Sequence, residues 1–325
     1  MHDCAIVNAS WIINPGADTP PLQHGSLIIR DGFIAEVGPA DEVETDGLTP
    51  IDARGLVLVP GLVNTHDHCL ECLTRALPGA QDAELGEWLR IHNPIWSQAT
   101  PEALQSATQI RAAELLLSGC TTTMDHNYLW PNGCSVDDQV EAMQSMGLRF
   151  HVSRGSVTIG ASQGGLTPDA VAENEADVLA DSERVIGRYH DPTPGSLLQV
   201  VLAPCSPYSV SDGFMRDTAA LARQHGVRLH THLAEGRDEH AWCLENLGQT
   251  PLRHIEALGW LADDAWFAHM ITLSAPEIVR LGMSGAGVAH CPCSNMRLGN
   301  GIAPIRSMLA RGVPVGIGVD GAASN

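Results

Sequence analysis

The sequence has 325 residues, of which 44% are hydrophobic, and a formal charge of −20 at pH 7. This length suits one large domain with an appendage, and the negative charge disfavours nucleic acids and anionic membrane surfaces as partners. We therefore expect a neutral or cationic small molecule as the ligand. No apolar run reaches the ~18 residues of a membrane span, and the N-terminal residues lack the pattern of a signal peptide.

The cysteine and lysine contents limit the expected cellular compartment and the kinds of catalytic site that the protein can have. Nine cysteines without a secretory signal predict a cytoplasmic protein, because a reducing compartment keeps thiols free. The chain has no lysine, and all 18 basic residues are arginines. It therefore has neither a Schiff-base lysine nor a carboxylated lysine that could bridge two metal ions. Any metal site is expected to hold a single ion.

The first 58 residues have the pattern of a small β domain. Residues 3–13, 26–30 and 33–38 are expected to be short strands. Asp31 and Gly32 separate the last two, and an Asp-Gly pair between apolar segments is a strong hairpin signal. We assign residues 1–58 to this domain.

From residue 59 to 325, short apolar segments alternate with longer helical patterns. Strands are expected at 61–66, 121–126, 148–153, 198–203, 227–232, 265–269, 287–291 and 314–320. Helices are expected, for example, at 101–118, 135–146, 168–189, 211–225, 238–258 and 302–311. Eight alternations predict an α/β fold, a (β/α)8 TIM-type barrel. The alternative, a doubly wound open sheet, would place a glycine-rich phosphate loop after an early strand. The glycine-rich residues 160–165 follow the third strand, and we interpret them as an active-site loop.

Metal-type side chains recur where the predicted strands end, the edge at which barrel enzymes carry their reactive residues. His66 and His68 follow the first strand, His232 the fifth, His269 the sixth, and Asp320 the eighth. Each alone has an ordinary structural interpretation, such as a core histidine or a capping aspartate. Together, three imidazoles and a carboxylate form a divalent-metal shell with room for one water. The recurrence favours a metal site. A rival zinc site made of the cysteines at 69–72 and 291–293 is a weaker interpretation, since both segments also suit packing.

Four stretches, GLVNTHDH, HTHLAE, FAH and GVDGAASN, resemble the amidohydrolase superfamily, in its branch of metal-dependent aminohydrolases for purines, pterins and triazines. The resemblance covers the whole chain. It implies that the N-terminal strands belong to a small β-sandwich. It also implies one divalent ion, zinc or otherwise iron, bound by four ligands, and these are His66, His68, His232 and Asp320.

The same resemblance implies that Glu235 and His269 act on substrate and water, and that His230 is structural. A bound divalent ion lowers the pKa of its water toward ~7. Asp320 could accept the proton, His269 could orient the nucleophile, and Glu235 could protonate a ring nitrogen before ammonia leaves. Asp320 would thus be both ligand and catalytic residue.

Longer stretches, including LLLSGCTTTMDHNY and RGSVTIGASQGGLTPD, resemble the group that deaminates 8-oxoguanine to urate. Pterins and hydroxy-s-triazines are the alternative substrates. Asp67 and Glu71 depart from that group, whose pattern has histidine and glutamine there, and Cys205 stands where adenosine-type relatives have histidine. The expected substrate contacts are Glu71, Trp88, Arg154, Gln163 and Cys205.

The resembled family continues beyond its eighth strand with a helix and the strands that complete the sandwich. From this resemblance, we expect the chain to be a fragment that aggregates or is inactive alone. A catalytically inactive barrel that serves as a scaffold is the alternative from another functional class. A homo-oligomer is compatible with the sequence, which does not define the oligomeric state.

Overall fold

A computed structural model describes residues 3–16 and 19–325. The chain forms two compact units, one up to Leu62 with Thr193–Gly195, and one from Val63 to Asn325 without that short segment. The division falls a few residues after the domain boundary expected between 58 and 59.

The N-terminal unit is built on one five-stranded sheet. Its strands are β1 (Cys4–Ile12), β2 (Leu22–Arg30), β3 (Phe33–Pro39), β4 (Thr49–Asp52) and β5 (Val57–Leu58). The sheet order is β3-β2-β1-β4, and β5 also pairs with β1. Asp31 and Gly32 join β2 to β3 with positive φ angles of 50° and 83°, as a two-residue hairpin turn requires. The sheet supplies one layer of the expected β-sandwich.

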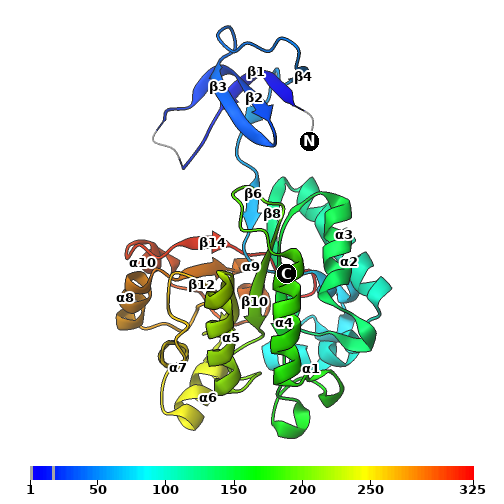
Figure 1. The fold of residues 1–325 in the computed structure, drawn as a ribbon. Helices are drawn as coiled ribbons and strands as arrows, with labels where there is room; N and C mark the ends of the chain where they lie inside the picture. Colours follow the sequence, from blue (N-terminus) through cyan, green and yellow to red (C-terminus); the bar gives the residue numbers. More distant parts are fainter. Residues whose placement is uncertain (1–2, 17–18) are drawn as a thin grey trace. The chain divides into compact units, whose positions relative to one another are not determined.

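The second unit is a closed barrel of eight parallel strands, which confirms the predicted (β/α)8 architecture (Figure 1). Its strands are β6 (Leu62–Asn64), β8 (Cys120–Asp125), β9 (Arg149–Ser156), β10 (Leu198–Pro204), β11 (Arg228–Leu233), β12 (Ala265–His269), β13 (Gly287–His290) and β14 (Val315–Ile317). Two further short strands, β7 (Asp67–His68) and β15 (Asp320–Gly321), pair with each other. This pairing joins the segment after the first barrel strand to the segment after the last.

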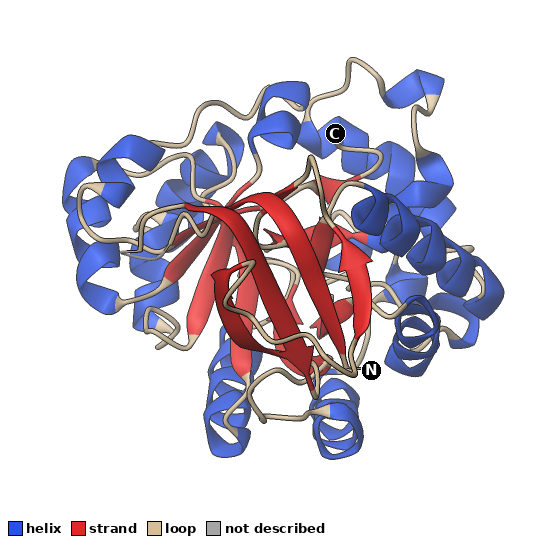
Figure 2. Cartoon of the chain, turned by 90° about the horizontal axis from the view of Figure 1, so that it is seen from above, coloured by secondary structure: helices blue, strands red, loops and turns tan. Residues whose placement is uncertain are grey.

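The helices lie outside the barrel strands (Figure 2). They are α1 (Leu85–Trp96), α2 (Pro101–Leu117), α3 (Val136–Met146), α4 (Glu175–Tyr189), α5 (Asp212–His225), α6 (Arg237–Leu247), α7 (Pro251–Ala257), α8 (Ala275–Ser284), α9 (Pro292–Arg297) and α10 (Ile305–Leu309). Short 3-10 turns cover Cys69–Thr74, Pro78–Ala80, Pro131–Gly133, Ala161–Gln163 and Asp169–Val171.

The expected helix at 302–311 is shorter in the structure, at Ile305–Leu309, and two others differ for clear local reasons. The expected helix at 238–258 is two helices, because Gly248 takes a left-handed conformation (φ 67°) that ends α6 and Pro251 starts α7. The expected helix at 168–189 starts only at Glu175, where the Asn174 side chain caps the backbone N–H groups of Ala176 and Asp177.

An apolar core fills the space between the barrel strands and the helices. Alternate strand residues such as Phe150, Val152, Leu202 and Phe267 are buried in it. This packing fixes the register of the strands and hence the position of the residues at their ends. All nine cysteines are free thiols. Among the described residues, no helix combines the length and the apolar character that crossing a membrane requires.

Candidate metal centre and active site

The structure brings together all five metal-type residues that the sequence placed at strand ends. His66 Nε2 lies 2.9 Å from Asp320 Oδ1, and His68 Nε2 lies 3.1 Å from His232 Nε2. His269 offers a ligand atom within 4.8 Å of those of His66, His232 and Asp320. All five residues are buried or nearly so.

Backbone carbonyls fix the orientation of two of these imidazoles. His68 donates from Nδ1 to the carbonyl of His126 at 2.8 Å, and His232 donates from Nδ1 to the carbonyl of Cys205 at 2.7 Å. A carbonyl oxygen can only accept, so the proton of each neutral ring sits on Nδ1. The Nε2 atoms of His68 and His232 therefore carry lone pairs.

Two consecutive hydrogen bonds through His230 fix the orientation of the third imidazole, that of His66. His230 donates from Nδ1 to the carbonyl of Trp266 at 2.9 Å, which leaves its Nε2 as an acceptor. His66 donates from Nδ1 to that Nε2 at 2.8 Å. The lone pair of His66 is thus also on Nε2, and the contact matches the structural role expected for His230.

The donor set fits a divalent metal ion. The Nε2 atoms of His68 and His232 lie 3.1 Å apart, and both carry lone pairs when the rings are neutral with their protons on Nδ1. His66 Nε2 and Asp320 Oδ1 are buried close by, 2.9 Å from each other, and with the His66 proton on Nδ1 both atoms are acceptors. Such a cluster of acceptors is repulsive unless a cation lies among them. Imidazole and carboxylate ligands suit zinc, iron and similar ions.

Unusual backbone conformations hold several of these side chains. His269, Met270, Asp320 and Ala234 have positive φ angles of 74°, 52°, 73° and 52°. Non-glycine residues rarely adopt this left-handed region, and such strain clusters at functional sites. In this protein the left-handed conformation turns the chain sharply at the carboxyl ends of β11 and β12 and at the start of β15.

Glu235 and His269 lie side by side next to the metal cluster. His269 Nε2 is 3.6 Å from Glu235 Oε1, and His269 donates from Nδ1 to the Asn295 side chain at 2.9 Å. Asn300 donates from Nδ2 to Glu235 Oε1 at 3.0 Å. Burial raises the pKa of Glu235 to about 7. Near neutral pH this carboxyl can therefore both give and take a proton.

Glu71 is buried beside the metal cluster and accepts hydrogen bonds from residues near the C-terminal end of the sequence. Its Oε2 accepts from the backbone N–H groups of Ala323 and Ser324, each at 3.0 Å, and from the Ser324 hydroxyl at 2.9 Å. Burial raises its pKa to about 7. Gly321 permits this approach, because a Cβ there would lie 1.9 Å from Glu71 Oε2. Among the described contacts, Oε1 is the oxygen left for another partner.

Cys205 lies next to the centre, with its Sγ 3.9 Å from His232 Nδ1, and Trp88 belongs to an apolar cluster that also contains Tyr128. Trp88 is buried in a cluster with Leu70 and Tyr128, against which Cys205 packs. The ring of Tyr128 lies 5.6 Å from that of His68. Among the described residues the buried indole Nε1 of Trp88 has no hydrogen-bond partner. Burial raises the pKa of the Cys205 thiol to about 12, so this thiol is neutral.

Two other expected substrate contacts are not brought to the cluster. Alternation along β9 turns Arg154 toward the helices, where Asp181 and Glu173 each bind its guanidinium at 2.6 Å. Gln163 is exposed and lines a surface hollow with Thr158 and Glu175. A buried ion pair with Asp181 and Glu173 describes Arg154 better than substrate binding.

The sequence analysis missed four residues of the site. His126 joins the imidazole cluster, Asn295 holds His269, Asn300 holds Glu235, and Glu239 binds the backbone of Glu235. His126 ends a predicted barrel strand, so the rule that identified the other ligands could have found it. The other three lie on helices or loops and carried no comparable signal.

Residues 57–325 match the sequence profile of the Amidohydrolase family. Together with the barrel and its His/Asp metal-binding cluster, this match shows that the chain belongs to the amidohydrolase family. Within it, the chain is an aminohydrolase, a hydrolase that acts on carbon–nitrogen bonds of cyclic compounds, like its named relatives.

Curated relatives act on several ring systems. The 8-oxoguanine deaminase of Pseudomonas aeruginosa is 44% identical over 98% of this chain and 72% of its own length. Isoxanthopterin deaminase from an unknown prokaryotic organism is 40% identical over 98% of this chain and 68% of its own length. Hydroxydechloroatrazine ethylaminohydrolase of Pseudomonas sp. strain ADP is 37% identical, and the chain spans 66% of its length.

A solved structure shows the same fold with a metal bound. The atrazine chlorohydrolase of Arthrobacter aurescens TC1, crystallised with zinc, superposes with a TM-score of 0.93 at 30% identity. The match covers 99% of this chain and 73% of that one. Metal use is therefore a property of this chain's structural relatives.

Proposed function

We propose that the protein is a metal-dependent deaminase that converts 8-oxoguanine and water to urate and ammonia. The observation that supports metal dependence is the convergence of imidazole lone pairs on one buried point, with His68 Nε2 and His232 Nε2 3.1 Å apart. The relative at 44% identity over 98% of the chain supports the substrate.

The proposed ligands are His66, His68, His232 and Asp320, and the proposed ion is zinc. Three neutral imidazoles and one carboxylate leave room for a water as a fifth ligand, a coordination number that catalytic zinc sites can reach. When bound, the ion supplies an acidified water, because coordination lowers the pKa of water from 15.7 toward ~7.

Three side chains handle the protons in the proposed reaction. Glu235, protonated at the start, gives its proton to a ring nitrogen, which makes the amino-bearing carbon electrophilic. Asp320 takes a proton from the water as the new carbon–oxygen bond forms, and His269 orients the nucleophile. Asp320 returns its proton to the amino nitrogen, the carbon–nitrogen bond breaks and ammonia leaves, while the new hydroxyl loses its proton to form the carbonyl and restores protonated Glu235. The protons lost by water thus end on ammonia and the ring.

Two buried polar atoms are the proposed contacts to the substrate ring. Glu71 Oε1 is the free carboxylate oxygen beside the metal cluster, and Trp88 Nε1 is a buried donor without a partner among the described residues. Trp88 Nε1 would donate to one exocyclic oxygen of the ring, and Glu71, whose pKa is raised to about 7, would in its protonated form donate from Oε1 to another. Cys205 packs at the same cluster as an apolar wall.

The test is ammonia release from a panel of 8-oxoguanine, guanine, isoxanthopterin and a hydroxy-s-triazine, with the zinc content of the same sample measured. We expect about one zinc per chain and the highest kcat/KM with 8-oxoguanine. A higher value for the pterin or the triazine would overturn the substrate assignment but keep the class. A folded protein that binds no metal would support the inactive scaffold instead.

A further inference from the structure

His126 is a buried imidazole at the centre that the proposed reaction does not use. It directly follows β8, and its Nε2 donates to the carbonyl of Ala203 at 2.9 Å. Its proton is therefore on Nε2, and Nδ1 carries a lone pair. That Nδ1 is fully buried and has no hydrogen-bond partner among the described residues. An unsatisfied buried acceptor is costly, so a function for it is expected.

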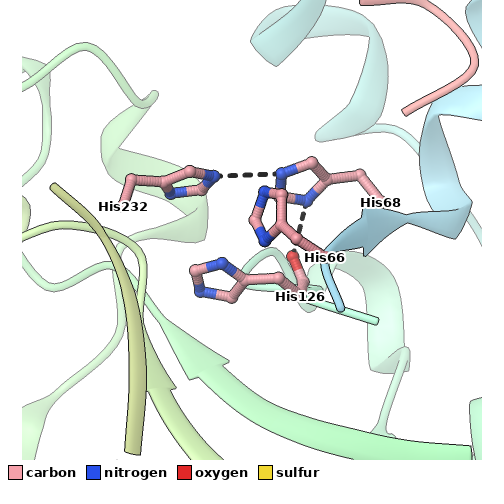
Figure 3. Close-up of side chains that lie close together, drawn as sticks. All are labelled: His66, His68, His126 and His232. Atoms are coloured by element: carbon pink, nitrogen blue, oxygen red, sulfur yellow. Dashed lines mark hydrogen bonds between the residues drawn. The ribbon is translucent and has the colours of Figure 1, made fainter. Parts of the chain in front are cut away.

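The free nitrogen of His126 belongs to the imidazole cluster. His66, His68, His126 and His232 each offer a ligand atom, and the four atoms lie within 4.8 Å of one another (Figure 3). The ring of His126 stacks on that of His232, with 4.7 Å between centroids and 24° between planes. The imidazole of His126 is therefore in direct contact with one of the proposed ligands, His232.

Among the described residues, none donates a hydrogen bond to Nδ1 of His126. The neighbouring nitrogens of His68 and His232 are themselves acceptors, because their protons are committed to carbonyls. A cation is the partner that satisfies all these lone pairs at once.

We propose that Nδ1 of His126 is a further ligand of the divalent ion, so that four imidazoles and Asp320 surround it. This inference rests on the metal centre of the proposed function. Two ligands of one zinc ion lie at most about 4.2 Å apart, twice the Zn–N bond. The spread of up to 4.8 Å among the four imidazole ligand atoms therefore closes with a shift of roughly half an ångström, and Asp320 Oδ1 adjoins this group 2.9 Å from His66 Nε2.

The added ligand has a chemical consequence. Five protein donors leave one position for water on an octahedral ion, whereas four donors suit a tetrahedral one. The centre should therefore hold Co²⁺ or Fe²⁺ in a six-coordinate state. His126 would thus contribute to which metal the protein retains.

The experiment compares His126→Gln with His92→Gln in the metal-loaded protein. Glutamine can place its amide N–H near the position of Nε2, and so keep the bond to Ala203, but it has no atom at Nδ1. His92 is the matched control, since it is buried, donates from Nδ1 to the Trp88 carbonyl, and lies outside both ligand groups.

Zinc affinity is measured by competition with a chelator, and the visible spectrum of the Co²⁺-loaded protein is recorded. His126→Gln should bind zinc at least about tenfold more weakly, and its Co²⁺ bands should intensify as the coordination number falls. His92→Gln should match the parent in both. Unchanged affinity and spectrum in a folded His126→Gln protein would overturn the proposal.

A second measurement on the unsubstituted protein does not depend on folding of a variant. X-ray absorption at the zinc edge counts the imidazoles around the ion. Four imidazoles per zinc would support the proposal, and three would overturn it. Two zinc ions per chain would also overturn it, because His126 would then serve a different ion. Loss of 8-oxoguanine turnover alone would bear on the proposed function and not on this ligand.

Discussion

The carboxylate of Glu239 binds the backbone N–H of Glu235 at 2.7 Å, four residues earlier in the chain. Its second oxygen accepts from the N–H of Ala234 at 2.5 Å, and the Tyr208 hydroxyl donates to the same oxygen. Ala234 has a left-handed backbone (φ 52°). Glu239 therefore holds the turn that aims Glu235 at the centre, at the start of α6.

This relationship predicts a loss of turnover in Glu239→Gln. An amide can accept only one of the two backbone N–H groups, and the unpaired one costs about 1–3 kcal/mol. We expect kcat to fall by about tenfold or more, with zinc content and the far-ultraviolet spectrum unchanged. Glu245→Gln, an exposed position of the same helix, is the control and should keep the parental kcat. Equal kcat values for the two variants would contradict the positioning role.

Glu235→Gln should keep the metal and lose most of its turnover. The amide can still meet Asn300 but cannot cycle a proton, and general acid–base catalysis is typically worth about 10²–10⁴ in rate. We expect kcat to fall by ~10²-fold or more. Zinc content of the purified variant is the check, and a metal-free product would make Glu235 a ligand instead.

Glu71→Gln should raise the turnover of 8-oxoguanine relative to the other rings of the panel. The amide oxygen can replace Oε2 as the acceptor for Ala323 and Ser324, and the amide N–H groups then occupy the place of Oε1. A changed donor in a buried site is worth about 1–3 kcal/mol, enough to reorder substrates. An unchanged ranking would remove Glu71 from the substrate pocket.

Removal of the metal should destabilise the fold. Chelation leaves His68 Nε2 and His232 Nε2 facing each other without a cation. A ligand at 100 times its Kd adds about 2.7 kcal/mol of stability, so we expect Tm to drop by several degrees. Zinc should restore Tm, whereas Mg²⁺ should not, because it prefers oxygen ligands. Identical melting curves with and without chelator would argue for the scaffold.

The sequence by itself determined the barrel and the proposed metal ligands. Barrel strands buried on both faces read as short apolar runs, and reactive residues follow them at one edge. His66, His68, His232, His269 and Asp320 could therefore be identified from their place after predicted strands. That rule depends only on local order along the chain.

Only the tertiary structure decided which other side chains share the site. Arg154 lies near the carboxyl end of a barrel strand as His232 does, yet its side chain turns outward to Asp181. Glu71 is held inside by a hydrogen bond from Ser324, far along the chain. The tautomers of His66 and His68 depend on acceptors in other strands. Hydrogen bonds between segments distant in sequence orient these side chains. The local pattern of apolar and polar residues does not reveal which distant residues form those bonds.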